Sequence, residues 1–181
     1  LDPAKYRLVC FNNLGSCFAL TLDNSGNIYT AYCAATNAPM GSTIVGSTSG
    51  SIFKIPTGSG VPQVFCNIPD NLAPPVTCNG NVIPCGSPNT CPPGIGDVCC
   101  DCAHSGQFFA SCLAAGRIYR ISSAGTLIEA FDHDTNTIGP PIREPGNSYD
   151  RYAPRGERIW AVKAHAGRLY YSVWGQEFAC S

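Results

Sequence analysis

The chain has 181 residues, of which 44% are hydrophobic and 13% charged, and its formal net charge is -1. This hydrophobic content supports a packed core. The weak net charge excludes the basic surface that nucleic acids and anionic membranes require. No apolar run reaches the roughly 18 to 20 residues that span a bilayer, and no export-signal pattern opens the chain. We therefore expect a soluble chain, either mature or part of a longer protein, with no nucleic-acid partner and no membrane insertion.

The first patterned segments predict two β-hairpins. Phe18–Leu22 and Ile28–Tyr32 are alternating or aromatic runs on either side of an Asn/Gly cluster, which is typical of two strands joined by a tight turn. Ser51–Ile55 and Val61–Phe65 flank a second turn that contains two glycines. Together these segments predict a four-stranded antiparallel meander.

The same pattern returns twice further along the chain. Gly106-Gln107-Phe108-Phe109 lies 80 residues after Gly26-Asn27-Ile28-Tyr29, and Gly167-Arg168-Leu169-Tyr170 follows 61 residues later. Repeats of this length indicate stacked supersecondary units. The predicted strands of the second and third copies are Val98–Cys102, Phe108–Cys112, Arg117–Ile121 and Leu127–Phe131, then Ile159–Lys163 and Leu169–Val173.

Tandem four-stranded meanders without helical periodicity predict an all-β chain of β-propeller-like blades. A solenoid or an immunoglobulin-type sandwich is the structural alternative. About two and a half blades cannot close a ring, which needs roughly 4 to 8, so we expect an incomplete, disulfide-rich propeller unit in which Tyr6–Phe11 is the outer strand of a preceding blade. Its expected parts within 1–181 are a first blade at 12–66, a Pro/Cys-rich insertion at 67–96, a second blade at 97–131, a loop at 132–154 and a partial third blade at 155–181.

Cysteine usage predicts the compartment. Twelve cysteines in 181 residues indicate an oxidising, extracellular or cell-surface location in which most are paired. Their spacing does not select the partners, although a bridge from Cys10 or Cys180 would tie the fragment shut or join subunits. The disulfide candidates are Cys10, Cys17, Cys33, Cys66, Cys78, Cys85, Cys91, Cys99, Cys100, Cys102, Cys112 and Cys180.

The densest thiol cluster, Cys99 to Cys102, raises the alternative of a zinc site. In an alternating strand Cys100 and Cys102 face one side and Cys99 the other, which favours disulfides over one tetrahedral site. No paired CxxC motifs accompany the cluster, so no metal is predicted there.

Three segments in the second half of the chain carry a family resemblance: Tyr152 to Val162 and Gly167 to Trp174, with Gly116–Ile121 before them. They resemble propeller modules of large secreted bacterial surface proteins. The resemblance covers roughly residues 94 to 174 and implies an extracellular scaffold or adhesion part. The dense cysteines and the proline-rich insertion depart from the pattern of those modules.

Other candidate sites have plainer interpretations. Asp132, Asp134 and Asn136 have the spacing that opens a calcium loop, but the glycine and glutamate expected later in that loop are absent. The three histidines of the chain, His104, His133 and His165, lie in no known catalytic motif. A carbohydrate-stacking platform is the alternative to sheet packing for the aromatic residues Trp160, Tyr170, Tyr171 and Trp174.

We therefore predict a non-enzymatic extracellular structural or adhesive module without a cofactor. A self-assembling surface or filament subunit is one form that such a module takes. Its expected partners are other copies of itself or the remainder of a larger propeller protein, with a surface glycan or protein as ligand. The alternative is a fragment of a hydrolase or lactonase-like enzyme that resembles six-bladed propeller lactonases or strictosidine-synthase-like proteins. For this alternative Asp101 is the single inner-strand carboxylate.

Overall fold

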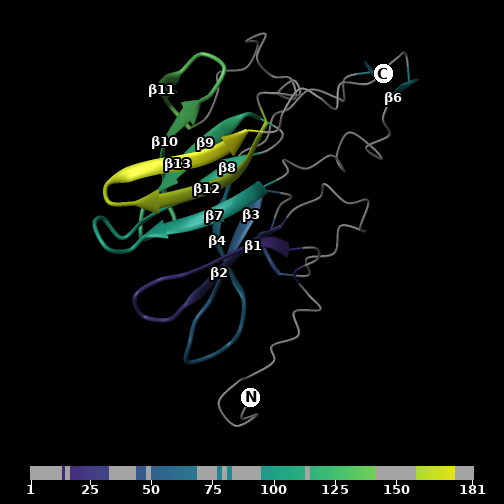
Figure 1. Cartoon of the computed structure of the whole chain (residues 1–181). Coiled ribbons are helices and arrows are strands. Elements are labelled where there is room, and N and C mark those ends of the chain that lie inside the picture. Colours follow the sequence, from purple (N-terminus) through teal and green to yellow (C-terminus); the bar gives the residue numbers. More distant parts are fainter. Residues whose placement is uncertain are drawn as a thin grey trace, which may run out of the picture.

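The computed structural model describes residues 14, 17–32, 44–47, 50–68, 77–78, 81–82, 95–112, 115–141 and 158–173. All regular structure in these residues is β-strand in antiparallel sheets, none of them closed, and this confirms the all-β prediction. Figure 1 shows the strands gathered into stacked sheets.

The first sheet has the order β1-β2-β3-β4. It is the predicted meander, with the fourth strand two residues later than expected, because the turn after β3 continues through Gly60 to Pro62. Its strands are Cys17–Leu22 (β1), Ile28–Tyr32 (β2), Ser51–Ile55 (β3) and Gln63–Asn67 (β4).

The second sheet has the order β11-β10-β9-β8-β7. Four of its strands are the predicted second meander, and the fifth, β11, comes from the segment expected to be a loop. Its strands are Ile95–Asp101 (β7), Gln107–Cys112 (β8), Arg117–Ile121 (β9), Leu127–Asp132 (β10) and Thr137–Gly139 (β11).

Two hairpins complete the described structure. The predicted partial third copy is β12 (Ile159–His165) paired with β13 (Arg168–Val173). Inside the proline-rich insertion, Thr77–Cys78 (β5) pairs with Asn81–Val82 (β6), a two-residue ladder that the composition did not predict.

The three repeated hairpins turn at the same glycine. Gly26, Gly106 and Gly167 have φ values of 76°, 65° and 72°, which glycine adopts without the steric cost that a Cβ brings. In the first turn Asp23 accepts hydrogen bonds from the backbone amides of Ser25 and Asn27, both 2.9 Å. The shared turn fixes the register of each hairpin.

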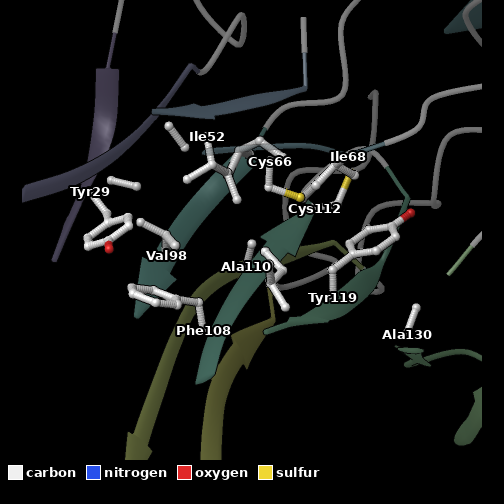
Figure 2. Close-up of a cluster of buried hydrophobic side chains, with 14 residues drawn as sticks. Tyr29, Ile52, Cys66, Ile68, Val98, Phe108, Ala110, Cys112, Tyr119 and Ala130 are labelled. Carbon is white, nitrogen blue, oxygen red and sulfur yellow. The ribbon is translucent and has the colours of Figure 1, made fainter. Parts of the chain in front are cut away.

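The main core lies between the first and second sheets. Figure 2 shows Tyr29 and Phe108 side by side in it, with Ile52, Cys66 and Cys112 further along the same interface. The rings of Tyr29 and Phe108 are 4.3 Å apart, and Phe65 completes an aromatic cluster with ring distances of 4.9 and 5.0 Å to them. This cluster joins the two sheets.

A second core lies between the opposite face of the second sheet and the β12–β13 hairpin. Cys99 and Ile118 of the sheet pack there against Ile159 and Val162 of the hairpin. Strand β7 therefore packs against β1 on one side and β12 on the other, as Figure 1 shows. The three units stack in chain order through their first strands.

Polar contacts fix both stacking interfaces. Toward the first sheet, the Cys100 amide donates to Thr21 Oγ1 at 3.3 Å. Toward the hairpin, the Val162 amide donates to Asp97 Oδ2 at 3.3 Å, and Ser111 Oγ donates to the Trp160 carbonyl at 3.0 Å. Gly96 makes this last approach possible, since a Cβ there would collide with the Trp160 carbonyl oxygen.

Candidate functional site

The most distinctive surface is the outward face of the β12–β13 hairpin. A bulge between Ile159 and Ala161 turns Trp160 to solvent, while Ile159 and Val162 stay buried. Tyr170 is 52% exposed and lies opposite Lys163 in the ladder. We call Trp160, Lys163 and Tyr170 the hairpin face. Its two large aromatic side chains and one cation are suited to contact with another surface.

A second exposed apolar surface lies at the other end of the stack. On the first sheet, Leu20 and Leu22 of β1 are 66% and 53% exposed. They belong to the side of the sheet that carries Phe53 and Ile55, which are buried in a small cluster with Leu14. We call Leu20 and Leu22 the β1 face.

The repeat relates the hairpin face to the interfaces inside the chain. Tyr29, Phe109 and Tyr170 occupy the same position after the turn glycine in the three units. Tyr29 packs in the core toward the second sheet, and Phe109 packs in the core toward the hairpin. Tyr170 lies on the corresponding face of the third unit, so in the other two units this face is covered by the unit that follows.

The inner side of the hairpin also carries an aromatic contact. The Tyr171 ring lies 5.8 Å from that of Phe131 and 5.6 Å from that of His133. The Tyr171 hydroxyl and His133 Nδ1 are 3.1 Å apart. Tyr171 is thus a packing residue, and of the four aromatic residues singled out from the sequence only Trp160 and Tyr170 belong to the hairpin face. Trp174 is outside the described residues.

Asp97 is a carboxylate that lies between two stacked units. Its Oδ1 accepts from its neighbour Val98 at 2.8 Å, and its Oδ2 accepts from Val162 of β12. Burial raises the pKa of Asp97 above the ordinary 3.8, although these two hydrogen bonds and the charge of Lys163 oppose the rise. No motif in the sequence singled out this residue.

The raised pKa predicts a pH dependence. A folded-state pKa above the unfolded value means that the folded protein binds the proton more tightly. The resulting stability is present below pH 3.8 and is lost as the pH rises through the folded pKa. We expect the Asp97→Asn variant, which stays uncharged, to gain stability relative to the unchanged chain as the pH rises from about 3 to 7. Urea unfolding of both chains measures this, and a constant or oppositely signed difference would contradict the assignment.

The described cysteines are in different chemical states. The sulfur atoms of Cys100 and Cys102, the two residues expected on one side of their strand, lie close enough together to form a disulfide. Cys66 and Cys99 are buried free thiols, and burial raises the pKa of each to about 11. Cys17 is exposed and Cys112 is buried, and Cys78 lies in β5. The remaining candidates lie outside the described residues: Cys10, Cys33, Cys85, Cys91 and Cys180.

The enzyme candidate, Asp101, is engaged in its own turn. Its carboxylate accepts from Ser105 Oγ at 3.0 Å and lies 3.1 Å from His104 Nδ1. Its backbone carbonyl accepts from the amides of His104, Ser105 and Gly106. His165, which occupies in the third unit the position that His104 has in the second, is exposed. The arrangement is that of a turn cap.

The three residues of the calcium candidate have different surroundings in the structure. Asp132 is buried, and its Oδ2 accepts from Arg117 Nε at 3.0 Å. Asp134 and Asn136 are exposed, and Asn136 has a φ of 53°, which fits a turn residue. Within the described residues no group of three or more His, Cys, Asp or Glu side chains could hold a metal ion.

Similarity to known proteins does not assign a function to the chain. No protein-family model and no curated protein matches the chain. Within the described ranges there is no helix long and apolar enough to cross a membrane.

Proposed function

We propose that the chain is a non-enzymatic extracellular structural or adhesive module built of propeller-like blades. The observation that supports this most is the repeated stacking of first strands, β1 on β7 and β7 on β12. In a propeller each blade packs against the next blade of the chain, and the blades are arranged around a central axis. The fan of sheets in Figure 1 is consistent with this arrangement.

The binding partner in this proposal is another copy of the chain or the remainder of a larger propeller protein. The hairpin face corresponds to surfaces that are covered by the next unit within the chain, and the β1 face lies at the opposite end of the stack. Contact between two different faces is heterologous, and such contacts form filaments when the rotation between copies does not close. A surface glycan that stacks on Trp160 and Tyr170 would use the same face.

The extracellular location rests on the cysteines. Twelve cysteines in 181 residues favour an oxidising compartment, and the proximity of the Cys100 and Cys102 sulfur atoms is compatible with it. Oxidation of most of the other cysteines stays a prediction.

Self-association is the testable consequence. We expect light scattering to show a mass that rises with the concentration of the chain, and Leu20→Asp to weaken this association at least about tenfold, because it places a charge in an apolar contact. Val61→Asp is the matched control, since Val61 is 65% exposed and belongs to the connection between β3 and β4, outside β1 and the β12–β13 hairpin. A chain that remains monomeric at high concentration would refute self-assembly, and equal effects of the two variants would refute the β1 face.

A further inference from the structure

Within the part of the chain that the structure describes, the third unit leaves unpaired one strand edge that is paired in the other two units. Among the described residues, β13 pairs only with β12. Its counterparts β2 and β8 each pair with strands on both sides. A strand edge without a neighbour presents backbone N–H and C=O groups that can pair with an added strand.

The two complete units define which strand fits such an edge. In the first sheet Ile28, Tyr29 and Thr30 lie opposite Ile55, Lys54 and Phe53. In the second sheet, the equivalent residues Phe108, Phe109 and Ala110 lie opposite Ile121, Arg120 and Tyr119. The register is the same, and the third strand reads Ile-aromatic-basic-Ile in both sheets.

One cross-strand pair in this register has a clear chemical basis. Lys54 Nζ lies 5.6 Å from the centre of the Tyr29 ring, which is the geometry of a cation–π contact. In the second sheet Arg120 lies opposite Phe109. The equivalent residue of β13 is Tyr170, an aromatic ring that is 52% exposed. Strand β13 therefore has the aromatic residue of this cross-strand pair.

We propose that the open edge of β13 binds an extended segment of another polypeptide that has the sequence pattern of β9. The segment adds antiparallel to β13. Its second isoleucine lies opposite Leu169, its basic residue opposite Tyr170 and its aromatic residue opposite Tyr171. Backbone hydrogen bonds supply the affinity, and the side-chain pattern supplies the register. This proposal deepens the proposed function by naming the chemistry of a partner, and it rests on the same blade repeat.

The probe is a synthetic peptide with the sequence of residues 116–132, which contains the third and fourth strands of the second unit. We expect saturable binding to the full chain, together with slower amide hydrogen exchange over 168–173. A peptide with Tyr119→Pro, which cannot pair as a central strand, should not bind. Absence of binding, or protection elsewhere without protection of β13, would overturn the proposal.

A double-variant comparison tests the register. Arg120→Glu in the peptide should weaken binding about two- to fivefold, the worth of an exposed cation–π contact, and this effect should disappear in the Tyr170→Ala chain. It should persist in the Tyr171→Ala chain, because Tyr171 points to the opposite face. Loss of the effect in both chains or in neither would contradict the register. Since the peptide measures edge binding and light scattering measures contact between faces, either result can fail without the other.

Discussion

Phe108→Ala is expected to lower the free energy of unfolding by about 3 to 5 kcal/mol. Phe108 is 2% exposed and contacts both Tyr29 and Phe65 across the interface of the first two sheets. The substitution removes the ring and leaves a cavity that the rigid sheets cannot fill. Such a loss is a large share of the stability of a typical domain.

Urea unfolding followed by tyrosine and tryptophan fluorescence measures this effect. Ile138→Ala is the control, since Ile138 is 66% exposed on β11 and its truncation should change stability by less than about 0.5 kcal/mol. A loss below about 1 kcal/mol for Phe108→Ala would mean that the aromatic cluster does not join the sheets.

Gly96→Ala is expected to cost about 1 to 3 kcal/mol by overpacking the interface between β7 and β12. The added methyl group would collide with the Trp160 carbonyl oxygen and would lie 3.0 Å from Ser111 Oγ. Because these two atoms hydrogen-bond to each other, the collision also disturbs the contact that holds the hairpin.

Hydrogen exchange resolves where the Gly96→Ala damage falls. We expect faster exchange over β12 and unchanged exchange in β1 and β2, which lie on the other side of the second sheet. Gly139→Ala is the matched control, because a Cβ at Gly139 would meet nothing within 4 Å. Equal exchange in β12 of the two variants would show that the hairpin does not depend on this close approach.

The local fold was largely readable from the sequence. Alternating runs such as Arg117–Ile121 and turn glycines such as Gly106 identify strands and hairpins, because both signals depend on neighbouring residues. Short strands were missed for the same reason. Thr137–Gly139 (β11) pairs with Ala130, Phe131 and Asp132 across one tight turn, and three residues are too few to establish an alternation.

The interfaces were not readable from the sequence. Asp97 and Gly96 acquire their roles only from β12, which follows more than 60 residues later. Within the second sheet, the ion pair of Arg117 and Asp132 likewise depends on the register of β9 and β10. The sequence predicted sheet packing for Trp160, Tyr170 and Tyr171, with an exposed platform as the alternative. Only the stacking of the sheets shows that Trp160 and Tyr170 face outward while Tyr171 packs against the second sheet.

The stacking of the three units in chain order is most directly tested by nuclear Overhauser contacts in the unmodified chain. This order predicts contacts between Thr21 and Cys100, from β1 to β7, and between Asp97 and Val162, from β7 to β12, in the same sample. It predicts none between β1 and β12, because β7 lies between them. Direct contacts between β1 and β12, or the absence of either set involving β7, would contradict it.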